Sequence, residues 1–136
     1  MQFRFLFAAA ALAIPTASHA QNAQPQTADR WQFINITADS SSVVLLDRQS
    51  LQRDGTIATV WVQFLMRSIT TDALGTNYKT VMLHETFNCT TRNVALTDYT
   101  TWTADGSTAG SKSFAPVQRA ITPGSVDEGV FYAVCK

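Results

Sequence analysis

The two histidines set the first limit on what this sequence could catalyse. His19 lies in an N-terminal segment that we expect to be removed, so histidine-dependent nucleophilic catalysis would have to use His84. His84 and Glu85 are neighbours on a predicted strand, where adjacent side chains point to opposite faces, so they cannot form a local acid–base pair. We therefore expect no catalytic residue and interpret His84 as a partly exposed sheet histidine, with a small hydrolase as the most distant alternative.

The segment around His84 also bears on metal binding. His84 to Asn88 begins like a zinc-peptidase motif, but it lacks the second histidine and lies in a strand pattern rather than a helix. We therefore expect no metal site and no cofactor. Glu85 interrupts an apolar strand face, and we expect it to lie at the sheet margin or to pair with an arginine such as Arg92 or Arg119. An acid catalyst would need a second carboxylate nearby, and the sequence identifies none.

Two cysteines, Cys89 and Cys135, are the residues most able to form a covalent cross-link. Export would place both in a compartment where disulfides form and persist, so we predict that they pair; two free buried thiols are the alternative. Strand alternation points Cys89 toward the core, and Cys135 ends a predicted helix. A bond between them would clamp that helix over the sheet.

Two aromatic residues, Tyr99 and Trp102, are the candidates for a binding surface. They precede the turn Ala104-Asp105-Gly106-Ser107, and aromatic anchors beside adaptable hydroxyls suit protein recognition. Burial of Trp102 in the core is an equal alternative.

The elements that would position these residues are mostly strands. Runs of aromatic and β-branched residues with turn signals between them predict six strands, at residues 31–37, 42–46, 56–67, 78–89, 93–102 and 111–117. Alternation in the longest run predicts one core face, made of Ala58, Val60, Val62, Phe64 and Met66. Residues 68–77 contain turn-forming residues, and we expect a mobile hairpin loop there.

Two segments break the strand pattern. Asp47 can accept backbone N–H bonds in a single short turn over residues 48–51, and Asp54-Gly55 then predicts a tight turn. Ser125 and Glu128 form a capping box, so a helix should begin at Val126. Its apolar stripe would lie on the sheet, which predicts an α+β fold: an antiparallel sheet of about six strands packed against a C-terminal helix and tied by one disulfide.

The N-terminus reads as a secretory signal peptide. A basic residue precedes a short apolar run, and small residues precede Ala20. We therefore expect cleavage between Ala20 and Gln21, which removes residues 1–20. We expect residues 21–29 to be a flexible tail and residues 30–136 a single domain. Loss of Arg4 leaves nine basic residues against ten acidic ones, without clusters of either sign, which argues against binding to nucleic acid. No second long apolar segment follows, so we expect no membrane insertion after processing.

The order of several short motifs resembles the surface-adhesin protein E family. The motifs cover nearly the whole mature chain: Trp31, Val44-Leu45-Leu46-Asp47, Ser50-Leu51, Asp54-Gly55, Val60-Trp61-Val62, Glu85-Thr86-Phe87-Asn88-Cys89, Arg92, Tyr99, Asp105-Gly106, Pro123-Gly124-Ser125-Val126 and Val134-Cys135. Two features depart from the family pattern. No lipid-attachment cysteine follows the expected cleavage point, and Phe114 stands where a tryptophan is expected.

The resemblance implies a function as well as the same fold. It implies a non-enzymatic envelope or surface protein, adhesin-like, which binds other proteins such as host extracellular-matrix components. We accordingly expect a protein partner and a location in the periplasm or at the cell surface. The resemblance is also compatible with assembly of this chain into a homodimer. The alternative is a periplasmic accessory factor that acts on another bacterial envelope protein.

Overall fold

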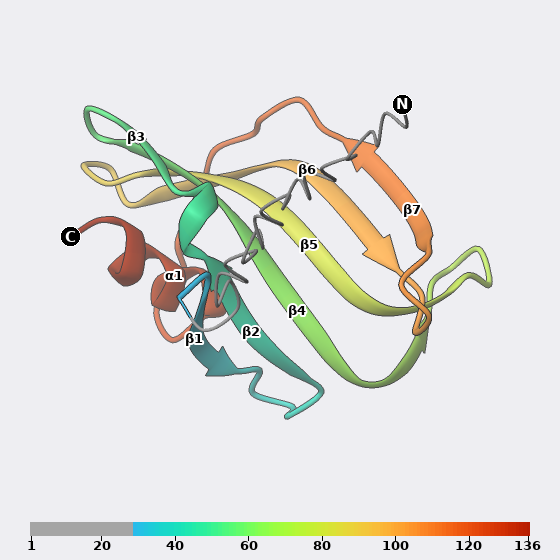
Figure 1. The fold of residues 1–136 in the computed structure, drawn as a ribbon. Helices are drawn as coiled ribbons and strands as arrows, with labels where there is room; N and C mark the ends of the chain where they lie inside the picture. The colour runs from blue at the N-terminus through green and yellow to red at the C-terminus, as the bar shows by residue number, and fades with distance from the viewer. Residues whose placement is uncertain (1–28) are drawn as a thin grey trace, which may run out of the picture.

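An antiparallel sheet forms most of the molecule in a computed structural model that describes residues 29–136 (Figure 1). Its main path runs β1-β2-β4-β5-β6-β7, and two short strands pair at its margins, β3 with β4 and β8 with β6. The bounds are β1 Trp31–Ile36, β2 Ser42–Asp47, β3 Gln52–Asp54, β4 Ile57–Thr71, β5 Asn77–Asn88, β6 Asn93–Trp102, β7 Thr108–Ser113 and β8 Arg119–Ala120. A 3₁₀ turn, η1 Arg48–Ser50, follows β2, and the helix α1 Val126–Val134 closes the chain. The sheet therefore has eight strands where about six were predicted.

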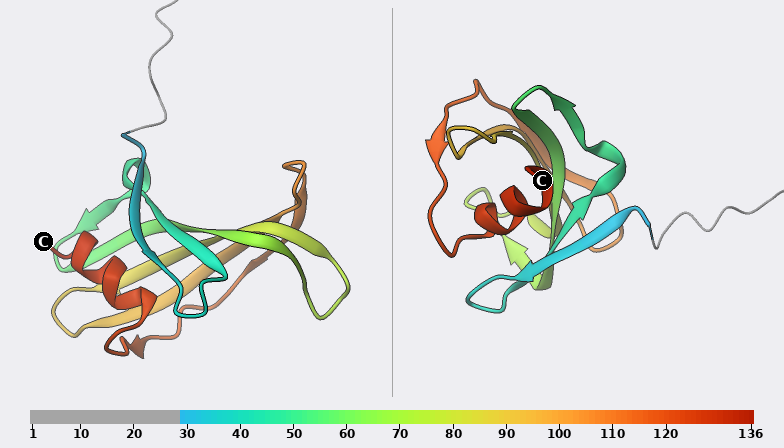
Figure 2. Two further views of the ribbon diagram at one scale, coloured as in Figure 1. Left: turned by 90° about the horizontal axis from the view of Figure 1, so that it is seen from below. Right: turned by 90° about the vertical axis from the view of Figure 1, so that its left-hand side faces the viewer.

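The β4–β5 hairpin is longer than the sequence predicted. The expected loop over residues 68–77 is wrong in extent, because β4 continues to Thr71 and β5 begins at Asn77. The β-branched residues 69–71 favour extended backbone, and the turn itself is held by Asp72, whose Oδ1 accepts the N–H groups of Leu74 and Thr76 at 2.9 Å each. Ile69 and Leu74 project into solvent from this hairpin, which extends away from the helix (Figure 2).

The last predicted strand, residues 111–117, is also shifted. The observed β7 begins at Thr108, directly after the Gly106 turn, and ends at Ser113 before Pro116. Proline cannot donate to a ladder, so the chain leaves the sheet edge there and returns as β8.

The hydrophobic core lies between one face of the sheet and the helix. Ala58, Val60 and Val62 of β4 are fully buried, as their alternation predicted, and Phe64 packs against them. The helix contributes Val130, Phe131 and Val134, and the sheet curves around it (Figure 2). We call this the inner face of the sheet and the opposite side, which the helix does not cover, the outer face.

The helix begins where the sequence predicted. The Ser125 hydroxyl accepts the N–H of Glu128 at 3.3 Å, and the Glu128 carboxylate accepts the N–H of Gly124 at 2.8 Å. The helix also approaches β1 closely at Gly129. A Cβ atom at this position would lie 3.0 Å from Cγ2 of Ile34, so any other residue would require the Ile34 side chain to shift.

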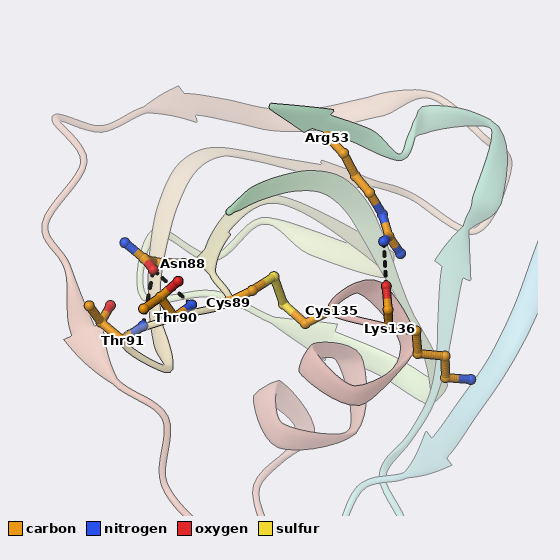
Figure 3. The surroundings of a disulfide bond; sticks show 7 residues. All are labelled: Arg53, Asn88, Cys89, Thr90, Thr91, Cys135 and Lys136. Carbon is orange, nitrogen blue, oxygen red and sulfur yellow. Dashed lines mark hydrogen bonds between the residues drawn. A yellow bond between two sulfur atoms is a disulfide. The ribbon is translucent and has the colours of Figure 1, made fainter. Parts of the chain in front are cut away.

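The predicted disulfide between Cys89 and Cys135 is present, with the two Cα atoms 5.4 Å apart (Figure 3). It joins the end of β5 to the residue that follows α1, as the strand and helix patterns indicated. Arg53 of β3 adds a second tie at the same end, because its guanidinium donates to the Lys136 carbonyl at 2.7 Å. The C-terminus is therefore fixed to the sheet by one covalent and one polar contact.

The expected signal peptide, its cleavage between Ala20 and Gln21, and nearly all of the 21–29 tail lie outside the residues that the structure describes. Within residues 29–136, no helix has the length and apolar composition needed to cross a membrane.

Candidate functional site

The outer face of the sheet carries side chains in three cross-strand rows. The strand register places them as Trp61, His84, Asp98 and Ser113 in the first row, Gln63, Met82, Thr100 and Ser111 in the second, and Leu65, Thr80, Trp102 and Thr108 in the third. Trp61, Met82 and Trp102 therefore lie on a diagonal across β4, β5 and β6. Diagonal neighbours in a sheet are close enough for long side chains to touch, so these three form a continuous apolar stripe.

A hollow of about 430 Å³ lies along this stripe. Its apolar lining is Trp61, Met82 and Trp102, to which Thr100 adds a hydroxyl and Arg30 and Asp47 add charged groups. The volume falls in the range of ligand pockets, roughly 300 to 1,000 Å³. A face rich in aromatic surface with a few polar groups at its edge is suited to recognition of another molecule.

The charged end of the hollow is internally neutralised. Asp47 is 3% exposed, and its Oδ2 accepts from Nε of Arg30 at 3.0 Å and from a terminal guanidinium nitrogen at 2.6 Å. Its other oxygen, Oδ1, caps η1 by accepting the N–H of Gln49 at 3.1 Å, the contact predicted from the sequence. Since Asp47 already pairs with Arg30, this hollow presents no net charge to a ligand.

A second hollow, of about 300 Å³, is also lined by Trp102. It shares Met82 and Trp102 with the first, and its remaining lining is Gln63, Lys79, Thr80, Thr103, Ala104 and Gly106. Lys79 belongs to this lining, but it is one position from Thr80 on β5, so its side chain points to the inner side of the sheet, and its Nζ donates to the Arg67 carbonyl at 2.5 Å.

His84 belongs to the outer face but is held in a structural network. Its ring stacks on Trp61 with centroids 4.6 Å apart, and its Nδ1 contacts Asp98 Oδ2 at 3.1 Å and the Thr97 hydroxyl at 2.9 Å. Ser113 donates to Asp98 Oδ1 at 2.7 Å and, with His84, holds the pKa of Asp98 below its ordinary value. In a serine–histidine–aspartate relay the serine would contact the imidazole, but here Asp98 lies between them. The network therefore orients Trp61 rather than activating a nucleophile.

The structure corrects the prediction for Glu85. This residue lies on the inner face of the central strand β5, 2% exposed, between Val60 and Leu96 of the neighbouring strands, and not at the sheet margin. The two expected partners pair elsewhere: Arg92 contacts Glu128 at 3.1 Å, and Arg119 contacts Asp127 at 2.5 Å. Both arginines remain half-exposed in these pairs, so neither bears the cost of full burial beside Glu85.

Burial changes the ionisation of Glu85. The pKa of its carboxyl is raised from 4.5 to about 8; loss of solvent is the largest cause, the charge of Asp127 acts in the same direction, and Arg119 opposes the shift. Such a shift also occurs in catalytic acids. Glu85 nevertheless lines neither hollow, so the raised pKa reflects its place in the core.

The two predicted binding residues do not share a face. Trp102 aligns with Thr80 on the outer face and lines both hollows, whereas Tyr99 aligns with Leu83 on the inner side. Three positions separate them along β6, and an odd separation reverses the side-chain direction. Sequence reasoning missed the contributions of Trp61, Met82 and the Arg30–Asp47 pair. A tryptophan placed opposite the core face of β4 was the available signal, but only the strand register brings it near Trp102.

Among residues 29–136, no group of three or more histidine, cysteine, aspartate or glutamate side chains could hold a metal ion.

Comparisons with known proteins give one consistent similarity. Residues 31–136 match the model of a family described as surface-adhesin protein E. Among solved structures, protein E of Haemophilus influenzae superposes with a TM-score of 0.60 at 14% sequence identity, covering 91% of this chain and 90% of that chain. A second crystal form of that protein gives 0.59 at 14% identity, covering 93% and 96%. At this identity the structural likeness shows a shared fold. None of the curated proteins matches the sequence.

Proposed function

Because the chain belongs to the surface-adhesin protein E family, we propose that it is an exported, non-enzymatic envelope protein that binds other proteins through the outer face of its sheet. Host extracellular-matrix proteins are the candidate ligands. The observation that carries this proposal is the apolar stripe of Trp61, Met82 and Trp102, which lines a hollow on a face that the helix leaves uncovered. Tryptophan is enriched among the residues that dominate binding energy at protein interfaces.

The same face carries further exposed apolar surface. Phe33 and Ile36 of β1 and Leu65 of β4 are exposed, and the register places all three on the outer face. Contiguous apolar surface of this kind on a small exported domain favours contact with a partner. The His84 network supports the same reading, since it fixes one of the two tryptophans in position before any ligand arrives.

Replacing Trp102 with alanine should weaken binding to a panel of immobilised, purified matrix proteins by about tenfold or more, because the indole lines both hollows. The matched control is Tyr99→Ala, which removes an aromatic ring from the inner side of the same strand and should leave affinity unchanged. Surface plasmon resonance measures both, and circular dichroism checks that each variant is folded. Loss of binding with Tyr99→Ala and not with Trp102→Ala would place the binding surface on the other side of the sheet.

Location distinguishes an adhesin from the periplasmic accessory factor. We expect a mature protein that begins at Gln21 and is accessible outside the outer membrane. Intact-mass measurement of the exported protein tests the cleavage, and protease shaving of whole cells with fractionation tests the location. A mature protein found only in the periplasm would favour the accessory factor.

A further inference from the structure

Resting on the proposed function, we infer that the larger hollow holds one uncharged aromatic side chain of the partner protein, a tyrosine or tryptophan with its own hydrogen-bonding group. The ring lies over Met82 between Trp61 and Trp102, and its polar edge contacts the Thr100 hydroxyl. The smaller hollow takes no part in this contact.

The walls of the larger hollow suit a flat ring. The register places Trp61 and Trp102 diagonally on either side of Met82, with each Cβ roughly 7 to 8 Å from that of Met82, so the two tryptophans stand roughly 15 Å apart. Aromatic rings prefer centroid separations of roughly 4.5 to 7 Å, so a ring between two indoles requires them roughly 9 to 14 Å apart. The two separations agree when the indoles lean inward over Met82. One ring then contacts both tryptophans, and an aliphatic side chain would lack this aromatic contact.

The floor of the larger hollow has an apolar half and a polar half. Met82 and Thr100 are directly opposite each other on β5 and β6, so their Cβ atoms lie roughly 5 Å apart. The Met82 thioether makes favourable contacts with aromatic rings. The Thr100 hydroxyl contacts the Ser111 hydroxyl at 3.4 Å, which leaves it able to accept an indole N–H or a phenol O–H. A ring with a polar edge matches both halves of this floor.

The charged residues of the lining disfavour other ligand groups. Oδ2 of Asp47 accepts two hydrogen bonds from Arg30, Oδ1 accepts one from Gln49, and the Asp47 side chain is buried. A cationic group would therefore find no free carboxylate, and an anionic group would have to compete with Asp47 for Arg30. A sugar would bring many hydroxyl donors to a hollow with few free acceptors, whereas an aromatic ring loses little solvation on entry.

The test compares three blocked peptides, acetyl-Gly-Ser-X-Ser-Gly-amide, in which X is tyrosine, phenylalanine or leucine. Each is titrated into the mature protein and followed by NMR of the indole N–H signals. We expect the tyrosine peptide to shift the signals of Trp61 and Trp102 more than that of Trp31, which lines neither hollow. It should bind about three- to tenfold more tightly than the phenylalanine peptide, the contribution of one neutral hydrogen bond, and the leucine peptide should bind least tightly.

A pair of threonine-to-valine variants makes the test specific. Thr100→Val removes the hydroxyl with little change in shape, so it should abolish the preference for tyrosine over phenylalanine and leave binding of the phenylalanine peptide unchanged. The control Thr80→Val makes the same change on the outer face of β5, where the side chain lines only the smaller hollow, and it should keep the preference. Circular dichroism checks that both variants are folded. A tyrosine preference that persists in Thr100→Val, or a leucine peptide that binds as tightly as the tyrosine peptide, would overturn the inference.

A glycan is the other class of ligand that the same titration tests. Methyl glucoside and lactose are the probes, and we expect neither to shift the indole signals at concentrations where the tyrosine peptide saturates the protein. Larger shifts of the Trp61 and Trp102 signals with either sugar than with the peptide would assign the hollow to a glycan and contradict the aromatic side chain.

The proposed function and this inference fail in different ways. Matrix-protein binding that depends on Trp102, together with no preference among the peptides, would leave the proposed function standing and overturn the aromatic occupant. Peptide binding with the expected tyrosine preference, but no binding to any intact partner protein, would support the occupant and contradict the proposed function.

Discussion

Removing the disulfide should lower the free energy of unfolding by roughly 4 kcal/mol, the chain-entropy value for a loop of 46 residues. The variant is the double substitution Cys89→Ser with Cys135→Ser, which leaves no single thiol to form mixed disulfides. The effect should be large because α1 has only nine residues, too few for a stable isolated helix. Without the bond, the helix depends on the packing of residues such as Val130, Phe131 and Val134 and on exposed polar contacts.

Urea denaturation followed by circular dichroism measures this loss. Reduction of the parent protein with dithiothreitol should reproduce it, and the double variant should not respond to the reductant. Release of the helix would expose Val60 and Val62, so the variant should also associate at concentrations where the parent does not. Equal stability of parent and variant would show that non-covalent contacts hold the helix without the disulfide.

The parts of the fold that follow from local pattern were predictable. Alternation identified the buried face of β4, because Ala58, Val60 and Val62 must all point the same way on a strand. The caps at Asp47 and Ser125 were also predictable, because each side chain satisfies a backbone N–H two or three residues away. The pairing of the cysteines was predictable because strand alternation points Cys89 inward and Cys135 directly follows the helix.

The parts that depend on strand register were not predictable. Trp61 and Trp102 are 41 positions apart in sequence. They line one hollow only because the register of β5 with β4 and with β6 places Met82 between them. The pairing of Arg30 with Asp47 likewise depends on β1 running beside β2. The partners of Arg92 and Arg119 depend on how α1 crosses the sheet, which places Glu128 and Asp127 within their reach. Sequence reasoning offered either arginine as a possible partner of Glu85 because it had no position for the helix.

Replacing the buried Glu85 with glutamine should change how stability depends on pH. The folded protein holds a proton on this carboxyl up to about pH 8, whereas the unfolded chain releases it near 4.5. Unfolding therefore releases a proton between these values, so the parent should lose stability as pH rises from 4.5 to 8 and lose no more from this group above 8. Each unit of pKa difference corresponds to about 1.4 kcal/mol, so the loss is on the order of several kcal/mol.

Two exposed carboxyls act in a different pH range and with the opposite sign. The backbone N–H of Ser41 and the Thr37 hydroxyl lower the pKa of Asp39 to about 2, and the Thr103 hydroxyl and the Ser107 N–H lower that of Asp105 to about 2. Their contributions are present above their ordinary pKa of 3.8 and are lost as pH falls toward 2. These two carboxyls and Glu85 together place maximal stability near pH 4 to 5. The loss of stability at higher pH is then due to Glu85 and not to the two aspartates.

Urea midpoints measured at intervals from pH 4 to pH 9 test the assignment. Glu85→Gln should match the parent near pH 4.5 and be more stable than the parent at pH 8, because an amide keeps the shape of the side chain and cannot ionise. The control Glu128→Gln makes the same change on the partly exposed helix start. This control should lower the stability modestly, because it weakens the contacts of Glu128 with Arg92 and Gly124. The stability of the control should still fall with pH between 4.5 and 8 as steeply as that of the parent. If the slope between pH 4.5 and 8 persists in Glu85→Gln, another group titrates in this range and Glu85 is ionised in the folded protein.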